Sequence, residues 1–439
     1  MREKAKTGAY TLALVWMTFF GCTGRTDETV PQSTEGTASQ AVTAELNGYS
    51  LGLNYNDDVN DFDTDDIDRI YNTDTRLPRW IRFIFNITNP YDQWVATGDW
   101  PAGKGWIAKY CSAHDSGVKT ALNIRWEFKN PGKLVPFVNG TCRGKGTCAL
   151  YENYSKFLTT QVLPLLEDCT DVLVIGNEPF LESLREDIKP NSNFTRFYKN
   201  IALDALQVWP YETIPFYFGS FEALWVHNPE NYADEDLARE ELLDFVNGDS
   251  RISGVDLHMH SSTLAQIDKA FEWLNDGSRL ANGKEIIITE FSPAPALRDD
   301  MDKNLNGAFK TKWKALDPNI ATLTRNGDYL DYAIKQGPRT PAEFQEWIAS
   351  LPFSGAVPHY VCDAWKKFRS HAGRFRLAFQ NATQGNTRPA GYSWKWPWII
   401  TPILMPITQK PVGGQPSVRW NWYDDVQKVL KDDPRSPCP

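Results

Sequence analysis

The stretch from residue 171 to 179 constrains the fold most, because a short run of aliphatic, largely β-branched residues ends abruptly in Asn177-Glu178-Pro179. Such a run is typical of a strand buried on both faces, as in a parallel sheet. Pro179 cannot donate a hydrogen bond to a neighbouring strand, so the strand ends there. Glu178 is therefore predicted at the carboxyl end of a buried parallel strand, where α/β barrels hold their reactive side chains.

A second apolar run, Glu285-Ile-Ile-Ile-Thr-Glu290, repeats this arrangement. A single glutamate at a strand end is often only a solvated side chain. Two of them, on strands that can face each other across the mouth of a barrel, instead predict a pair of carboxylates of the kind that cleaves glycosidic bonds.

Strand-like runs alternate with helix-like patterns along the rest of the chain. We expect strands at residues 50–54, 80–85, 118–126, 171–176, 215–220, 254–260, 285–290 and 354–360. Eight alternations predict an α/β fold, specifically a (β/α)8 TIM barrel with long loops on the catalytic face. The excursion 292–337 is expected on the same side as the two glutamates.

The first 45 residues carry the signs of an export signal followed by a tether. Basic residues precede an apolar segment, 11–20, that is too short to span a bilayer. Gly21-Cys22 follows it and resembles the processing site of a bacterial lipoprotein. We therefore expect a signal peptide at 1–21, an acylated Cys22 that anchors the protein to the outer membrane or cell surface, and a flexible tether at 22–45. A plain secretory signal is the alternative.

The cysteine count agrees with export. Of seven cysteines, six remain once Cys22 is acylated, and an even number is expected in an oxidising compartment. No spacing resembles a zinc site. The disulfide candidates are Cys142–Cys148 within one Gly-rich loop, Cys111–Cys169 near the ends of neighbouring helices, and Cys362–Cys438.

The net charge and the composition limit which kinds of partner the protein is expected to bind. The net charge of −9 argues against nucleic acid. The 17 tryptophans suggest flat platforms for a ligand as well as core packing. No hinge-like linker interrupts the chain after the tether, so we expect residues 46–439 to form a single barrel domain and the protein to be a monomer.

Two sequence patterns resemble metal-binding motifs, and we expect neither of them to bind a metal ion. The acidic run 57–68 resembles a calcium loop, but Asp66 stands where such a loop needs Gly and Asn72 where it needs a bidentate Glu. His258 and His260 form a His-X-His pair of the kind that binds metal in barrel amidohydrolases. In those enzymes the pair lies on the first strand, whereas in this chain it lies on the sixth, so we expect no metal cofactor. The ordinary interpretation of His258 is a histidine packed in the core.

Asn177-Glu178-Pro179 on the fourth strand and Thr289-Glu290 on the seventh resemble the large clan of retaining glycoside hydrolases with (β/α)8 barrels. Most members read Trp-Asn-Glu-Pro, whereas Gly176 stands in place of the Trp here. The resemblance covers most of the chain from about residue 50 as a pattern, and its motifs specify the clan rather than a family or a substrate.

The resemblance implies roles for individual residues. Glu178 would be the acid/base and Glu290 the nucleophile, while Asn177 would contact the substrate 2-hydroxyl. Arg82 looks like the clan's arginine beside the nucleophile, and His260 occupies the region where the clan has a Tyr or His. Such chemistry needs a proton on the acid, and we expect partial burial and the charge of its neighbour to keep Glu178 protonated near neutral pH.

Aromatic side chains after two predicted strands are candidates for sugar-binding subsites. Trp126 follows the third strand, and His359 and Trp365 follow the predicted eighth strand. Sugar rings stack on such side chains through their C–H faces.

These inferences lead to an exported, lipid-anchored retaining glycosidase that acts on a β-linked polysaccharide or oligosaccharide without a cofactor. The alternative from another class is a carbohydrate-binding surface lipoprotein that keeps the barrel but has lost turnover, against which the presence of both glutamates argues. A metal-dependent hydrolase is the third hypothesis.

Overall fold

The computed structural model describes residues 48–55, 70–71, 79–129, 135–136, 151–222, 229–276, 279–382, 400–405, 408–410, 417–431 and 438. The predicted signal peptide, Cys22, the tether, the acidic run and the Cys142–Cys148 pair lie outside these residues. No helix in the described part of the chain is long and apolar enough to cross a membrane.

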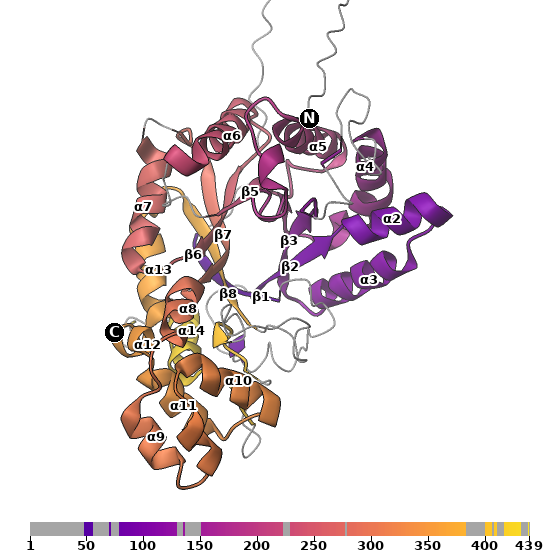
Figure 1. The fold of residues 1–439 in the computed structure, drawn as a ribbon. Helices are drawn as coiled ribbons and strands as arrows, with labels where there is room; N and C mark the ends of the chain where they lie inside the picture. Colours follow the sequence, from indigo (N-terminus) through magenta and orange to yellow (C-terminus); the bar gives the residue numbers. More distant parts are fainter. Residues whose placement is uncertain are drawn as a thin grey trace, which may run out of the picture. The chain divides into compact units, whose positions relative to one another are not determined.

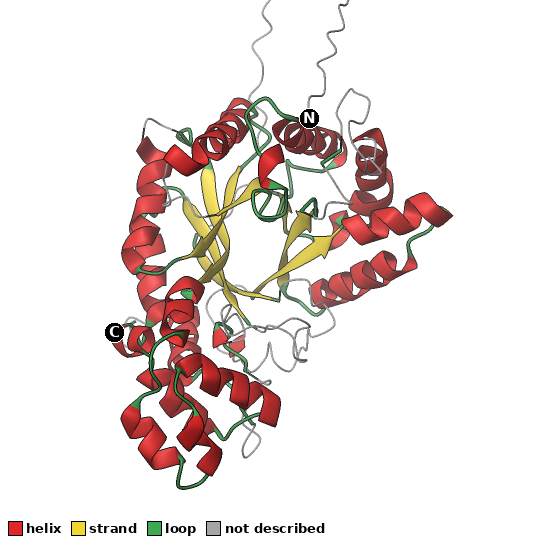
Figure 2. Cartoon of the chain, viewed as in Figure 1, coloured by secondary structure: helices red, strands yellow, loops and turns green. Residues whose placement is uncertain are grey.

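Eight parallel strands close into a barrel in sequence order, as Figures 1 and 2 show. They are β1 (Ser50–Asn54), β2 (Trp80–Asn86), β3 (Lys119–Arg125), β4 (Val172–Ile175), β5 (Phe216–Glu222), β6 (Gly254–His260), β7 (Glu285–Ser292) and β8 (Phe375–Asn381). Since every strand runs the same way, all the carboxyl ends meet at one mouth. The predicted (β/α)8 TIM barrel is confirmed.

Helices surround the strands (Figure 2). Those following β2 to β6 are α2 (Thr88–Thr97), α3 (Pro101–Asp115), α4 (Tyr151–Phe157), α5 (Asn193–Val208), α6 (Pro229–Gly248) and α7 (Leu264–Asn275). Short π and 3-10 turns continue α4 at Leu158–Val162, Leu163–Leu165 and Glu167–Cys169, and another lies at Arg185–Asp187. The apolar face of α5, with Phe194, Phe197 and Ile201 buried, illustrates why these segments form amphipathic helices against the sheet.

The chain between β7 and β8 folds into a set of helices of its own. They are α8 (Ala294–Met301), α9 (Gly307–Trp313), the 3-10 turn Pro318–Thr322, α10 (Asn326–Gln336), α11 (Pro341–Ser350), α12 (Pro352–Ala356) and α13 (Tyr360–Ser370). Helices α8 to α12 pack on one another, and α13 packs on α7 and α14 (Trp420–Lys431), as Figure 1 shows. Thr340 caps α11 by accepting a hydrogen bond from the backbone of Glu343, as the Thr-Pro start predicts.

The prediction of the eighth strand at residues 354–360 is wrong. Residues 354–360 form the end of α12 and the turn before α13, not a strand, and the eighth strand is β8 at Phe375–Asn381. Pro352 starts α12 at its first turn, and a proline inside the run, Pro358, suits no central strand. The amphipathic helix α13 then serves as the last crossover before β8.

The interior of the barrel is packed rather than open. A separate apolar cluster fills it, made of Trp80, Ala121, Val172, Val174, Tyr217, Ile287, Leu377 and Phe379. Side chains two positions further along a strand point the same way. Arg82, Asn123 and Thr289 therefore form a polar layer directly above this cluster, towards the mouth.

Two of the predicted disulfides are present. Cys111 of α3 bonds to Cys169 after α4, and Cys362 of α13 bonds to Cys438 near the C-terminus. The second bond closes a loop of 76 residues and ties the end of the chain to the helix that precedes β8.

Candidate active site

Glu178 follows β4 in a strained turn. Gly176 has φ +108° and Glu178 itself has φ +48°, which is uncommon for a residue other than glycine. A Cβ on Gly176 would lie 1.6 Å from the carbonyl oxygen of Gly219 on β5, so only glycine fits this backbone contact. Strain of this kind collects at functional sites.

Arg82 forms the centre of a buried polar network. Its guanidinium Nη1 donates to Glu290 Oε1 at 2.6 Å and to Asn54 at 3.0 Å, Nη2 donates to Asn177 at 2.5 Å, and Nε donates to Asn123 at 2.9 Å. The side chain of Arg82 is fully buried. Acceptors from β1, β3 and β4 thus hold the guanidinium in one orientation against Glu290.

His258 connects the two glutamates. Its Nδ1 lies 3.0 Å from Glu178 Oε1, and its Nε2 lies 3.0 Å from the hydroxyl of Thr289 and 3.9 Å from Glu290 Oε1. Since Thr289 donates its own proton to Asp256 at 2.6 Å, the hydroxyl accepts from His258, and Nε2 carries a hydrogen. His258 is therefore part of the site and not an ordinary core histidine.

His260 lies nearer the solvent and also faces both carboxylates. Its Nε2 is 3.3 Å from Glu290 Oε2 and 3.9 Å from Glu178 Oε1, while Nδ1 lies 2.9 Å from the hydroxyl of Ser292. The side chains of Glu178, Glu290 and His260 are 19%, 11% and 12% exposed. One nitrogen thus reaches both glutamates in a place that solvent also reaches.

The surroundings of Glu290 favour its charged form. Burial alone would raise the pKa of this carboxyl, but the charges of His258, Arg82 and His260 hold the pKa well below its ordinary value. Glu290 is therefore an ionised carboxylate throughout the neutral range.

Glu178 is in a different protonation state from the predicted one. Burial would raise its pKa, but the hydrogen bond and positive charge of His258 lower the pKa below its ordinary value. Burial lowers the pKa of His258, and the charges of Glu290 and Glu178 outweigh this and raise it. The expectation that Glu178 alone holds a proton is wrong for the free protein, because the proton of this pair lies on His258.

Asp256 supports the site from below. Its carboxylate accepts from Asn123 at 2.8 Å, from the Thr289 backbone N–H at 2.9 Å, and from the hydroxyls of Thr289 and Ser220. These contacts fix the ends of β3, β5 and β7 relative to β6. Asp256, His258 and His260 alternate along β6 and share its inward face.

Sequence reasoning missed Glu222. It ends β5 beside His258, its register partner on β6. The residue is 5% exposed, and neither carboxyl oxygen has a hydrogen-bond partner. Burial raises its pKa to about 8, with Arg239 lowering it and the charge of Glu178 adding to the rise. Only the period-2 pattern of β5, extended two residues beyond its predicted end, could have indicated this position.

Of the three aromatic side chains predicted to bind sugar, Trp126 and Trp365 are buried and His359 contacts α14. Trp126 is fully buried and packs edge-on against Phe197 and Tyr198 of α5. Trp365 is buried in α13 against Phe375, and His359 Nδ1 lies 2.8 Å from Asp425 of α14. The predicted contacts with a sugar therefore lack a surface at Trp126 and Trp365. His359 and Trp365 do not follow a strand, because they belong to the helical crossover before β8.

A metal ion could also use part of this site. Within the described ranges, Glu178, His258 and His260 each offer one ligand atom, and these atoms lie within 4.8 Å of one another.

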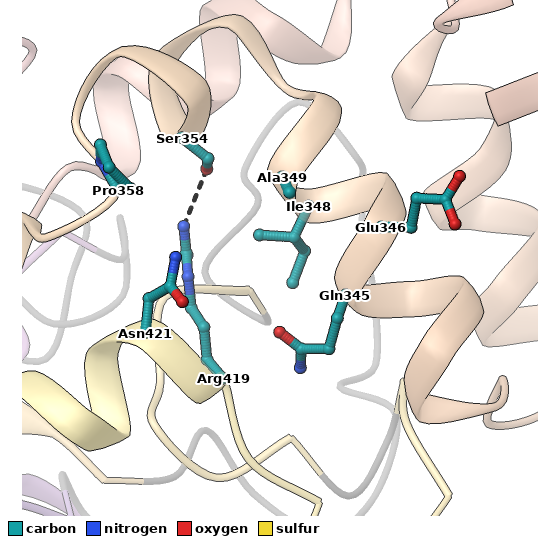
Figure 3. A pocket seen from close by; sticks show the side chains of 8 residues that line it. All are labelled: Gln345, Glu346, Ile348, Ala349, Ser354, Pro358, Arg419 and Asn421. Carbon is teal, nitrogen blue, oxygen red and sulfur yellow. Dashed lines mark hydrogen bonds between the residues drawn. The ribbon is translucent and has the colours of Figure 1, made fainter. Parts of the chain in front are cut away.

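A separate pocket of about 300 Å³ lies between α11, α12 and α14, as Figure 3 shows. Buried Arg419 reaches across it, donating to the Ser354 hydroxyl and the Ile400 carbonyl, both at 2.8 Å. Glu346 points away from the arginine (Figure 3). None of the residues that line the pocket belongs to the glutamate–histidine cluster. Arg419 directly precedes α14 and ties its start to Ser354 of α12.

The chain matches no protein-family model and no curated protein sequence. Among solved structures it is similar to an endo-1,4-β-xylanase from Caldicellulosiruptor owensensis, with 14% identity, a TM-score of 0.45, and coverage of 86% of this chain and 96% of that one. The exo-β-1,4-mannosidase Op5Man5 from Opitutaceae bacterium strain TAV5 gives 10% identity and a TM-score of 0.44, covering 90% of this chain and 62% of that one. A GH113 β-1,4-mannanase gives 11% identity and a TM-score of 0.39, covering 76% and 88%. Likenesses this distant carry no argument about activity.

Proposed function

We propose that this chain is a retaining glycoside hydrolase that cleaves β-glycosidic bonds of a polysaccharide or oligosaccharide. The observation that carries the proposal is the pairing of Glu290 with the fully buried Arg82 beside a second glutamate. A nucleophilic carboxylate must remain ionised, and the low pKa of Glu290 meets that need.

The spacing of the carboxylates is compatible with a double displacement. Glu178 Oε1 and Glu290 Oε2 both lie near His260 Nε2, at 3.9 and 3.3 Å. They are therefore at most about 7 Å apart, which admits the separation of about 5–5.5 Å typical of retaining enzymes.

The reaction divides between the two glutamates. Glu290 attacks the anomeric carbon and forms a glycosyl–enzyme ester, while Glu178 protonates the departing glycosidic oxygen. Glu178 then takes a proton from water, whose oxygen displaces Glu290 and restores the carboxylate. In the free protein the proton needed for the first step lies on His258, 3.0 Å from Glu178, so it passes to Glu178 as substrate excludes water.

Asn177 is proposed to contact the sugar beside the nucleophile. It is held by Arg82 and lies next to Glu178 in the chain. We also propose a cellular location for the protein: an acylated Cys22 would anchor a monomeric enzyme outside the cytoplasm, where its polysaccharide substrate is found.

The test is hydrolysis of a panel of β-linked polysaccharides by the wild type, Glu178→Gln and Glu290→Gln. Both variants should lose hydrolysis nearly completely while still binding glycan, and Glu346→Gln, a surface carboxylate paired with Lys312, should remain active. NMR of the first product anomer distinguishes retention from inversion. Full hydrolysis by Glu290→Gln would reject the proposal, and loss of activity in a chelator would favour a metal-dependent hydrolase instead.

A further inference from the structure

We propose that Glu178, His258 and His260 form a binding site for a transition-metal ion of the Zn²⁺ class, and that the bound ion inhibits the enzyme. The three ligand atoms are Glu178 Oε1, His258 Nδ1 and His260 Nε2. They come from two neighbouring parts of the mouth, the turn after β4 and the end of β6.

The separations of these atoms suit one ion. His258 Nδ1 and His260 Nε2 lie 3.0 and 3.9 Å from Glu178 Oε1, and no pair of the three atoms exceeds 4.8 Å. Tetrahedral ligands about 2.0–2.1 Å from Zn²⁺ are about 3.4 Å apart. Shifts of a few tenths of an ångström in the two contacts of Glu178 therefore place both within the ideal shell, and the His260 ring turns towards His258 to complete it.

The hydrogen bonds behind the two imidazoles orient them for ligation. His258 Nε2–H donates to Thr289, whose own proton goes to Asp256. Neutral His258 therefore has its lone pair on Nδ1, facing Glu178. His260 Nε2 donates to Glu290 in the free protein, and a metal ion replaces that proton; the Ser292 hydroxyl, 2.9 Å from His260 Nδ1, then accepts the hydrogen of the other nitrogen. Histidines that bind metals are held in this way by an acceptor on their other nitrogen.

The charges and ligand types select the ion. Two imidazole nitrogens with one carboxylate suit Zn²⁺, Cu²⁺ or Ni²⁺, whereas Mg²⁺ and Ca²⁺ prefer oxygen ligands. Glu290 Oε2, 3.3 Å from His260 Nε2, brings a second negative charge that offsets the divalent cation. Exposure of Glu178 and His260 at the mouth leaves a path for the ion and a position for a water ligand.

Inhibition follows from the shared atom, and this step depends on the proposed function. Glu178 cannot protonate a glycosidic oxygen while its Oε1 is bound to a metal ion. Metal binding and hydrolysis therefore exclude each other, and the ion acts as a reversible inhibitor rather than a cofactor.

The experiment measures metal binding directly. Full-length protein is stripped with a chelator and dialysed, then titrated with Zn²⁺ by equilibrium dialysis and with Co²⁺ by visible absorption. We expect one ion per chain and the intense bands of four-coordinate Co²⁺. Glu178→Gln and His260→Gln should each weaken binding at least tenfold, and Ser292→Ala should weaken it less. His114→Gln removes a histidine of α3 that lies near Asp171 and should bind as the wild type does.

The outcomes separate the site from the function. Absence of a bound ion, or binding that His260→Gln and Ser292→Ala both leave unchanged while circular dichroism shows them folded, overturns the metal site. Zn²⁺ that inhibits hydrolysis over the concentrations at which it binds, with recovery in chelator, supports the whole inference. Zn²⁺ binding by a metal-free protein that hydrolyses no glycan retains the metal site and removes the proposed function.

Discussion

The two glutamates at the barrel mouth sit in contrasting surroundings. Glu290 faces Arg82, a fully buried cation that asparagines from three strands or loops hold in place. Glu178 faces His258, whose charge depends on pH. Glu290 therefore has a permanent counter-charge in addition to the two histidines, whereas the counter-charges beside Glu178 are histidines alone and can return a proton.

This difference matches the two roles in the proposed reaction. A nucleophile must never be protonated, and arginine does not lose its charge in the working pH range. An acid/base must change its protonation state twice in each cycle, which a histidine neighbour permits. Fixed and titratable counter-charges thus distinguish the glutamates more clearly than their positions do.

The sharpest test of the contrast uses alanine at each glutamate. Glu290→Ala should lower hydrolysis of every substrate by about 10⁴-fold or more, because no covalent intermediate forms. Glu178→Ala should lower hydrolysis of natural glycans by about 10²–10⁴-fold. It should spare the first step on aryl glycosides whose leaving group needs no proton. Burst kinetics on such aryl substrates measure this, and equal losses for both variants would contradict the assigned roles.

The second largest effect is expected on stability, when the permanent counter-charge of Glu290 is removed. Arg82→Met removes the permanent counter-charge of a buried carboxylate and leaves only the two histidines beside it, which costs about 3–5 kcal/mol of unfolding free energy. Urea denaturation measures the loss. The matched control is Arg82→Met combined with Glu290→Gln, which should recover part of that stability because the buried negative charge is gone. No recovery would mean that Arg82 stabilises the barrel through its asparagine contacts alone.

The titratable counter-charge should appear in the pH profile. Against the effect of burial, the pKa of His258 is raised above its ordinary value, chiefly by the charges of Glu290 and Glu178, so the pair keeps its proton to a higher pH than a free imidazole and loses it as pH rises through that raised pKa. In His258→Gln the proton can come only from Glu178, and the alkaline limb of kcat/KM should move to lower pH by about one unit. His114→Gln should leave the limb in place. The acid limb should stay far below neutrality in both variants, because Glu290 remains ionised.

The smallest effect is expected from substitution of Glu222, a third carboxyl near Glu178, and it should appear in the stability of the protein. Its pKa is raised to about 8, so the folded state keeps a proton that the unfolded state has released. This contribution to stability is complete below pH ~4 and is lost as pH rises towards 8. Glu222→Gln should therefore raise stability at pH 7–8 by about 1 kcal/mol, after the cost of burying its amide, and not at pH 4. Thermal melts at pH 4 and at pH 7–8 measure the change in stability. An equal shift of Tm at both pH values would contradict a protonated Glu222 in the folded state.

The sequence predicted much of the fold because each barrel strand is a local pattern. Seven strands, from β1 to β7, lie where apolar runs predict them. The eighth was wrong because Phe375–Asn381 reads Phe-Arg-Leu-Ala-Phe-Gln-Asn, in which Arg376 interrupts the apolar run. Arg376 pairs with Glu285 on the neighbouring strand, a compensation that no local pattern reveals.

The chain by itself determined that two glutamates end buried parallel strands, since β-branched runs, Pro179 and side-chain alternation are properties of neighbouring residues. Only closure of the barrel decided what those glutamates face. It brings Arg82 of β2, His258 of β6 and Thr289 of β7 into one polar layer. Protonation depends on distances between charges in a dry interior, and those distances exist only once the ring of strands has closed.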